Sequence, residues 1–294
     1  MKPAPFEYPA PYSADEALAL LAEHGYDAKV LAGGQSLIPM MNFRLAQPAV
    51  LVDLNNIAGL FFIRADGNGT GGLRLGAMTR QSQVEYDDLV ADRAPLIREV
   101  MPQIAYPQIR SRGTFGGSLA HADPSAELVA STIALGGRLR LRSQAGERWV
   151  PASEFFVGLF TTVLEPDELL MEIALPAMPP RSGWAFRQIT RRHHDFCVAG
   201  VAVVVTLDKR GRCDGARLVF LSAGDGPVVA HQAAQSLIGQ APTPEAIRAA
   251  SEAAASGDID PGTDIHASAE YRRYLSKVLA RRTLSEAFGR AKGA

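Results

Sequence analysis

Residues 29–45 read KVLAGGQSLIPMMNFRL, and this stretch decides how the first part of the chain is interpreted. Residues 30–32 form a short apolar run, typical of a buried strand, which Gly33 and Gly34 end. Paired glycines let backbone N–H groups approach an anion closely, because no Cβ atom intervenes. The amide of Gln35 and the hydroxyl of Ser36 add further donors, so the stretch is a candidate anion-binding loop.

A second glycine pair occurs in Thr114-Phe115-Gly116-Gly117-Ser118, shortly before a predicted helix. Either motif taken alone is most simply a turn. Two such loops, one from each of two neighbouring subdomains, are able to hold the two phosphates of a dinucleotide from opposite sides. The pair of motifs therefore predicts a dinucleotide site between them.

The chain before residue 177 divides into two small α/β units, about 1–55 and 56–177. In the first unit Ser13 is expected to cap a helix, with Glu16 completing a capping box and Gly25 ending the helix. The second unit contains apolar runs that predict strands and amphipathic patterns that predict helices: strands 61–63, 73–75, 139–141 and 169–175, and helices near 82–91 and 95–105.

Two more expectations concern the second unit. Asp123 is predicted to be the N-cap of a helix that begins at Pro124 and ends at the glycines of 136–137. Gly67-Asn68-Gly69-Thr70-Gly71-Gly72 matches the dinucleotide fingerprint G-x-G-x-x-G, but a strand pattern follows it instead of a helix. We therefore interpret that match as a hairpin turn.

Three prolines in residues 176–183, PAMPPRSG, indicate a boundary, after which a C-terminal α+β domain begins. Three strand patterns are followed there by three helical patterns: strands 184–190, 197–207 and 214–222, and helices 228–238, 244–256 and 268–288. His193, His194 and Asp195 do not predict a metal site, because adjacent residues on a strand would point their imidazoles to opposite faces. No metal ligand is assigned anywhere in the chain.

Composition excludes several classes of function. The chain has 294 residues, a length that suggests roughly two domains, and a net charge of −1, which argues against nucleic acid as the main partner. It contains only two cysteines, too few for a Cys-ligated iron–sulfur cluster or a disulfide framework. The N-terminus shows no signal-peptide pattern, and the longest apolar run, 196–205, is too short to span a membrane, so the expected location is cytoplasmic.

Five segments together resemble the FAD-binding medium subunit of molybdenum hydroxylases, a family that includes the medium subunit of carbon monoxide dehydrogenase and the flavin domain of xanthine dehydrogenase. The resemblance covers nearly the whole chain, and the order and spacing of the segments are more specific than any one motif. The segments are KVLAGGQSLIPMMNFRL (29–45), RSRGTFGGSLAHADPSAEL (110–128), FFVGLFTTVLEPDELL (155–170), AFRQITRRHHDFCVAGVAVVV (185–205) and EYRRYLSKVLARRTL (270–284).

The resemblance implies an α+β fold and a domain division. An FAD-binding domain, residues 1–177, would consist of two α/β subdomains of the PCMH/vanillyl-alcohol-oxidase type. A C-terminal α+β domain, residues 184–290, would contain a three-stranded antiparallel sheet and a helical bundle.

The resemblance also implies a set of FAD-binding residues. Both glycine loops would bind the pyrophosphate and ribityl groups through backbone amides, although Ser118 stands where the family often has Asn. The backbone of Leu170 would meet the isoalloxazine ring, and Ile104 would make an apolar contact with the flavin. Arg187 would place a cation near the ring, and Glu127, or else Asp123, would contact the flavin. The complete set is Ala32, Gly33, Gly34, Gln35, Ser36, Leu37, Ile104, Thr114, Gly116, Gly117, Ser118, Asp123, Glu127, Leu170 and Arg187.

The function that the resemblance implies is electron transfer. A small subunit would carry two [2Fe–2S] clusters, a large subunit the molybdenum cofactor, and this chain FAD, from which electrons pass to a quinone, NAD or oxygen. The subunits would assemble as a dimer of heterotrimers, a heterohexamer. No general acid, base or nucleophile is assigned to the chain. Two alternatives remain open: a self-sufficient FAD-dependent oxidoreductase with its own substrate, and a non-redox scaffold or chaperone that has lost FAD.

Overall fold

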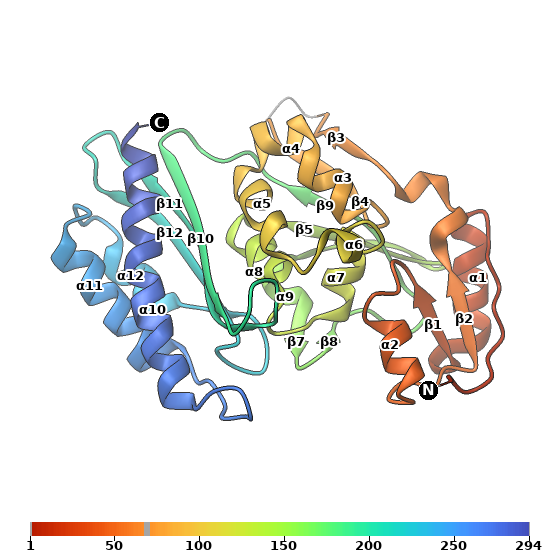
Figure 1. Cartoon of the computed structure of the whole chain (residues 1–294). Helices are drawn as coiled ribbons and strands as arrows, with labels where there is room; N and C mark the ends of the chain where they lie inside the picture. Colours follow the sequence, from red (N-terminus) through yellow and green to blue (C-terminus); the bar gives the residue numbers. More distant parts are fainter. Residues whose placement is uncertain (1, 68–70, 294) are drawn as a thin grey trace.

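The computed structural model describes residues 2–67 and 71–293 (Figure 1). An N-terminal unit, a central unit and a C-terminal unit follow one another along the chain, from right to left in Figure 1. Their buried apolar side chains form three clusters, and the largest cluster joins the central and C-terminal units.

The N-terminal unit is a pair of parallel strands covered by a helix. Its elements are α1 (Ala14–His24), β1 (Ala28–Leu31), α2 (Leu37–Asn42) and β2 (Val50–Asp53). The Ser13 side chain accepts a hydrogen bond from the Glu16 N–H, and Gly25 ends α1 with a φ of 50°, as the sequence predicts. The Glu16 carboxylate accepts instead from the Tyr12 N–H, so the expected capping box is only half formed.

The central unit is built on a five-stranded antiparallel sheet in the order β3-β4-β9-β5-β6. Helices cover one of its faces, and a small β7–β8 hairpin lies at one end (Figure 1). The elements are β3 (Ile63–Ala65), β4 (Leu73–Gly76), α3 (Gln81–Tyr86), α4 (Asp88–Arg93), α5 (Pro95–Val100), α6 (Pro107–Arg110), α7 (Phe115–His121), α8 (Glu127–Ala134), β5 (Arg138–Ser143), β6 (Gly146–Pro151), α9 (Ala152–Phe155), β7 (Phe156–Gly158), β8 (Thr161–Thr162) and β9 (Leu169–Leu175).

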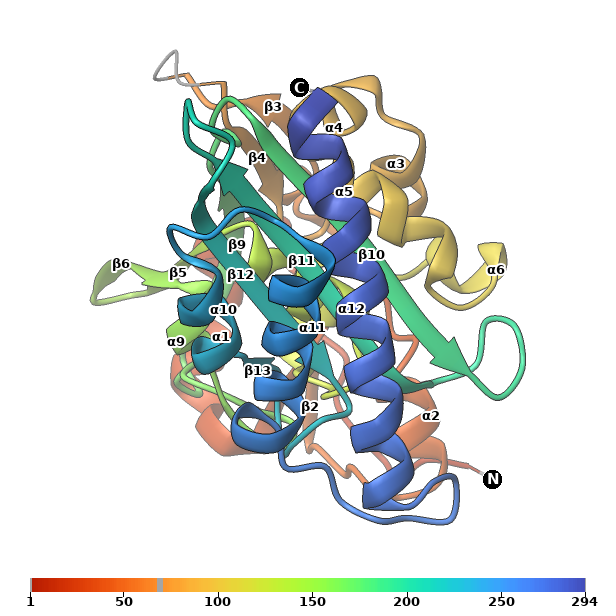
Figure 2. The same ribbon diagram turned by 90° about the vertical axis from the view of Figure 1, so that its left-hand side faces the viewer.

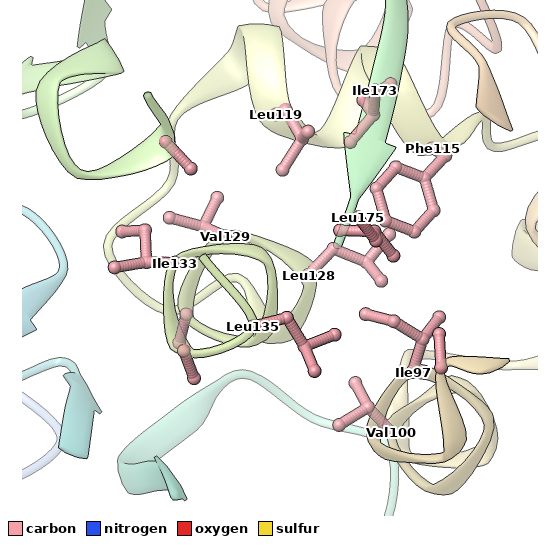
Figure 3. Close-up of a cluster of buried hydrophobic side chains, with 14 of the residues drawn as sticks. Ile97, Val100, Phe115, Leu119, Leu128, Val129, Ile133, Leu135, Ile173 and Leu175 are labelled. Carbon is pink, nitrogen blue, oxygen red and sulfur yellow. The ribbon is translucent and has the colours of Figure 1, made fainter. Parts of the chain in front are cut away.

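Helix α8 is at the centre of the largest apolar cluster. Figure 3 shows Leu128 of α8 close to Phe115 of α7 and to Leu175 of β9. The α5 side chains Ile97 and Val100 lie below Leu175 in that view. The residues of α8 after Glu127 are all buried. This packing fixes the first turn of α8 and the first turn of α7 in relation to the end of β9.

The C-terminal unit is an antiparallel sheet in the order β10-β11-β12-β13, covered on one face by helices. Its elements are β10 (Ser182–Thr190), β11 (Cys197–Leu207), β12 (Cys213–Leu221), β13 (Val228–Val229), α10 (His231–Leu237), α11 (Pro244–Ala253) and α12 (Ala269–Gly293). The long helix α12 runs across the sheet in Figure 2. Side chains alternate along β10: Ala185 belongs to the cluster under the helices, and Phe186 to the cluster shared with the central unit.

Several elements differ from the sequence-based predictions. The helix predicted near 82–91 is two helices, α3 and α4, separated at Asp87. The helix predicted near 95–105 is α5, which ends at Val100 and is followed by a short 3-10 turn. Helix α8 begins at Glu127 rather than at Pro124, because Asp123 accepts a hydrogen bond from the Ser125 N–H and so caps a turn that precedes the helix. The predicted helix 228–238 begins with the two-residue strand β13, which adds a fourth strand to the expected three. The second glycine motif is the first turn of α7 rather than a loop before a helix.

The G-x-G-x-x-G match connects β3 and β4, which pair antiparallel with Ile63 opposite Leu75. A strand thus follows the match, as predicted; residues 68–70 of the motif lie outside the described residues. In the described ranges, no helix is both long and apolar enough to cross a membrane.

Candidate functional site

The first glycine segment, which we define as residues 32–37, connects β1 to α2. Gly34 has a φ of 73°, a conformation that residues with a Cβ atom rarely adopt. Gly33 lies against the main chain of Arg112, and a Cβ atom at position 33 would stand 2.3 Å from the Arg112 carbonyl oxygen. Glycine at position 33 therefore allows the segment to touch the chain that leads into α7.

The first glycine segment presents a row of backbone donors. Among the described residues, the N–H groups of Gly34, Gln35, Ser36 and Leu37 have no hydrogen-bond partner. Both glycine carbonyl groups of the segment are occupied: that of Gly33 accepts from the Gln35 side chain and that of Gly34 from the Ile38 N–H. Consecutive free N–H groups at a glycine turn are a typical site for a phosphate oxygen.

The second glycine segment, residues 114–118, has its donors turned inward. The Thr114 side chain caps α7 by accepting from the Gly117 N–H at 3.0 Å. The N–H groups of Phe115, Gly116 and Ser118 bond to the carbonyl oxygens of Thr79, Ala77 and Thr114. Within the part of the chain that the structure describes, the Thr114 N–H is the only one of this segment without a hydrogen-bond partner. Among the described residues, the first segment therefore presents several free backbone N–H groups, whereas the second, expected to offer several as well, presents one.

The two glycine segments are in contact. A Cβ atom at Gly117 would lie 3.2 Å from the Cβ atom of Ala32. The second segment thus packs against the first, and the absence of a side chain at Gly117 allows this close approach. The Ser118 side chain is half-buried on the same turn of α7. The structure brings the two motifs together, as the sequence predicts.

A polar network that sequence patterns did not indicate lies under the first glycine segment. The Tyr8 hydroxyl donates to Asp53, and Asn55 donates to Asp53 and, at 3.0 Å, to the Ala32 carbonyl oxygen. The Arg80 guanidinium donates to the Asn55 side-chain oxygen and to the Arg112 carbonyl oxygen, both at 2.5 Å. These residues are far apart in the sequence, so no local spacing could have revealed the network.

Glu127, at the first position of α8, faces β10 of the C-terminal unit. The Gln188 side-chain amide donates to the Glu127 carboxyl group at 3.1 Å. Burial raises the pKa of Glu127 to about 7. The Gln188 side-chain oxygen is buried and has no partner among the described residues. A carboxyl group in this setting changes protonation near neutral pH.

Asp123 and His121 lie on the short connection between α7 and α8. The Asp123 carboxylate is engaged by the Ser125 N–H at 2.8 Å. The His121 ring packs against Phe160 of the β7–β8 hairpin with 5.1 Å between centroids, and burial lowers the pKa of His121. Both side chains thus have local structural partners.

Leu170, in the middle strand β9, and Ile104, shortly after α5, are buried apolar residues of the central unit. The carbonyl oxygen of Met171, next to Leu170, accepts from the Ala77 N–H, and the Ala77 carbonyl oxygen accepts from Gly116. The start of β9 is therefore joined to the second glycine segment. Ile104 belongs to the largest apolar cluster, and its carbonyl oxygen accepts from the Arg110 guanidinium.

Arg187 is the one candidate that the structure separates from the others. Its side chain pairs with Glu286 of α12 at 2.7 Å, on the face of β10 that the helices cover. Its neighbour Gln188 points the other way, toward Glu127. This arrangement gives no support to the expected position of Arg187 near a flavin ring.

His193 and His194 lie in the turn between β10 and β11 and not on a strand, so the expectation that their rings face opposite ways is wrong. The two ring centroids are 4.4 Å apart, and the His194 ring also lies 5.0 Å from that of Tyr106. His194 has a φ of 67°. The described residues contain no group of three or more His, Cys, Asp or Glu side chains arranged to hold a metal ion.

Family models match almost the whole chain. Residues 4–178 match the FAD binding domain in molybdopterin dehydrogenase, and residues 184–287 match the CO dehydrogenase flavoprotein C-terminal domain.

Curated relatives and solved structures agree with these matches. The alpha subunit of the 6-hydroxypseudooxynicotine dehydrogenase complex of Paenarthrobacter nicotinovorans is 40% identical, with 99% of this chain and 97% of that protein covered. The carbon monoxide dehydrogenase medium chain of Hydrogenophaga pseudoflava is 38% identical, with 99% of each covered. A solved structure of carbon monoxide dehydrogenase from the same organism superposes with a TM-score of 0.94 at 39% identity, covering 99% of both chains. The chain belongs to the FAD-binding medium subunits of the molybdenum hydroxylases, the family of carbon monoxide dehydrogenase and xanthine dehydrogenase, and is an FAD-containing oxidoreductase subunit.

Proposed function

We propose that this chain is the flavin-bearing electron outlet of a molybdenum hydroxylase. It receives electrons from [2Fe–2S] clusters on a small partner subunit and delivers them to an external acceptor: a quinone, NAD or oxygen. A large partner subunit holds the molybdenum cofactor and oxidises the substrate. The observation that carries the proposal is the first glycine segment, whose free N–H groups and glycine contacts suit a cofactor pyrophosphate.

The residues present fit FAD. The N–H groups of Gly34 to Leu37 would donate to the pyrophosphate oxygens, while Ala32 and Gly33 hold the segment against the chain before α7. Thr114 and Ser118 add a free N–H and a hydroxyl on the neighbouring turn. Gly116 and Gly117 act by allowing close packing. Bound FAD supplies the redox chemistry, since a flavin accepts electrons singly and can release two together.

Toward the flavin end, the backbone of Leu170 and the apolar side chain of Ile104 would contact the flavin, and Glu127 would provide a carboxyl group held by Gln188. Because its pKa lies near 7, Glu127 can both accept and donate a hydrogen bond at neutral pH. Asp123 stands four residues earlier and is engaged in its own turn, so Glu127 is the better candidate. Arg187 is left out of the proposed site because it pairs with Glu286 on the far face of β10.

The partners are part of the same proposal. Relatives are named as subunits of a dehydrogenase complex and as medium chains, which supports assembly with other subunits. The proposed assembly is a dimer of heterotrimers, each with a large and a small subunit beside this chain. Exposed apolar side chains on the β7–β8 hairpin, Val157, Leu159 and Phe160, offer surface for such contacts. Both cysteines are free and buried, which fits a reducing, cytoplasmic setting.

The experiment is performed on the complex purified from its native source. We expect FAD, iron and molybdenum to copurify with the chain. After FAD is removed, substrate should still bleach the iron–sulfur absorbance, whereas turnover with an external acceptor should stop. Added FAD should restore that turnover.

Three results would contradict the proposal. Rapid substrate oxidation by the FAD-loaded chain alone would favour a self-sufficient oxidoreductase. Full acceptor turnover by the FAD-free complex would show that electrons leave by another route, and a chain that never takes up FAD would favour a scaffold.

A further inference from the structure

We propose that Arg80 is a positioning residue for FAD: its guanidinium joins the first glycine segment to the chain before α7 and thereby sets the affinity for the cofactor. The inference rests on FAD occupying the first glycine segment. Arg80 immediately precedes α3 and lies outside every segment that carried the family resemblance.

The hydrogen bonds of Arg80 reach both walls of the proposed site. One nitrogen, Nη1, donates to the Arg112 carbonyl oxygen at 2.5 Å. This is the oxygen against which Gly33 packs. The other nitrogen, Nη2, donates to the Asn55 side-chain oxygen, and the Asn55 amide donates in turn to the Ala32 carbonyl oxygen at 3.0 Å.

These contacts form a closed ring around Gly33. On one side, the Asn55 amide donates a hydrogen bond to Ala32, the residue before Gly33. On the other side, the Arg112 carbonyl group packs against Gly33 itself. Arg80 is the only link between the two sides that the described hydrogen bonds show. The free N–H groups follow directly after this ring, so their direction depends on it.

The geometry requires a guanidinium rather than a simple cation. Arginine presents planar N–H donors on separate nitrogens, whereas the lysine ammonium is a single point on a flexible stem. The acceptors of Arg80 are an amide oxygen and a main-chain oxygen, neither of which is a carboxylate. Burial, and next the Arg112 charge, lower the pKa of Arg80, so the side chain is partly removed from water and depends on these acceptors.

The test measures FAD affinity of the full chain. FAD is stripped and titrated back, and the quenching of flavin fluorescence gives the Kd. We expect Arg80→Lys and Arg80→Met to raise the Kd at least tenfold each, which corresponds to about 1.4 kcal/mol. Arg93→Lys is the matched control, because Arg93 also bonds a main-chain oxygen, that of Gly72, but away from the site. It should change the Kd less than twofold.

A double-mutant cycle separates positioning from general stability. Asn55→Ala breaks the same ring from its other end and should also raise the Kd about tenfold. In the Asn55→Ala background, Arg80→Lys should add less than threefold, because the link is already broken. The unfolding midpoints of FAD-free Arg80→Lys and Arg93→Lys should be similar. If Arg80→Met does not fold, Arg80→Lys and Asn55→Ala still decide the question.

Three outcomes would overturn the proposal. Wild-type affinity in Arg80→Lys, with weak binding in Arg80→Met, would show that only the positive charge matters. Fully multiplicative effects of Arg80→Lys and Asn55→Ala would show that the two residues act separately. Gly34→Val tests separately whether FAD binds at the first glycine segment. If Gly34→Val and Arg80→Lys both bound FAD normally, the proposed location of the site would be wrong. If Gly34→Val lost FAD while Arg80→Lys bound it normally, only the role of Arg80 would be refuted.

Discussion

At Glu127 a single side chain couples the central unit to the C-terminal unit through the Gln188 amide. Burial raises its pKa to about 7, from an ordinary value of 4.5. Between these two pH values the folded chain holds a proton that the unfolded chain releases. The free energy of unfolding therefore falls as pH rises through this window.

We predict that Glu127→Gln abolishes this part of the pH dependence. In the FAD-free wild type, the loss of stability from pH 4.5 to pH 7 should be on the order of 1–3 kcal/mol larger than in the variant. Urea unfolding across this pH range measures the difference. Glu154→Gln, at an exposed position of α9, is the control. Parallel pH profiles for wild type and Glu127→Gln would show that the carboxyl group is not buried as described.

Gly33→Ala should push the first glycine segment away from the chain that leads into α7, because the new methyl group meets the Arg112 main-chain oxygen, which cannot rotate away. We expect the Kd for FAD to rise roughly tenfold or more and stability to fall by about 1–3 kcal/mol. Gly59→Ala is the matched control, since a Cβ atom there has no neighbour within 4 Å. Fluorescence titration and thermal unfolding measure the two effects; unchanged FAD binding in Gly33→Ala would contradict the proposed contact.

At the scale of elements, the sequence predicted what local chemistry determines. The cap of α1 at Ser13 formed as expected, because the side-chain oxygen meets an N–H group three residues away. The start of α8 was predicted three residues early, because Asp123 caps a turn with the same type of bond. Spacing alone does not distinguish a capped turn from a capped helix.

The candidate site divides in the same way. Gly33 and Gly117 could be found from local motifs, because paired glycines mark places where main chains approach closely. Asn55 and Arg80 could not, because their role depends on contacts between strands and loops far apart in the sequence. Arg187 shows the converse: its motif matched, but the alternation of side chains along β10 turned it toward α12.

The packing of α12 on β10 depends on Gly183. A Cβ atom there would stand 1.9 Å from the Ala287 carbonyl oxygen of α12. We predict that Gly183→Ala lowers the free energy of unfolding by at least about 1–3 kcal/mol, because α12 must move away from the sheet to make room for the methyl group. Gly262→Ala, where a Cβ atom meets nothing within 4 Å, should have a small effect. Equal stability of the two variants in urea unfolding would contradict the close helix–sheet contact.

At the scale of the whole molecule, the central and C-terminal units share one apolar cluster. Phe186, Val204 and Leu221 of the C-terminal sheet belong to the same cluster as Leu128 of α8 and Val100 of α5. A polar contact reinforces the junction: Glu99 at α5 pairs with Arg290 of α12. Neither unit can unfold without exposing the apolar face of the other.

We therefore predict one cooperative unfolding transition. The two tryptophans report on the two units, since Trp149 is in β6 and Trp184 in β10. Trp149→Phe leaves a probe of the C-terminal unit, and Trp184→Phe leaves a probe of the central unit. Circular dichroism of each variant gives the effect of its substitution on the overall unfolding midpoint in urea. After this correction, the fluorescence midpoints of the two variants should coincide. Two separate midpoints would mean that the units unfold independently.

The unpartnered N–H groups of the first glycine segment have a consequence for the amount of protein as well as for its chemistry. Only the folded chain presents these groups together, so a ligand that binds them shifts the folding equilibrium by mass action. Free FAD at a hundred times its Kd would add about 2.7 kcal/mol to stability. The abundance of this subunit in a cell should then follow the supply of flavin. A shortage of flavin would reduce the number of folded chains before it lowered the turnover of the chains that remain.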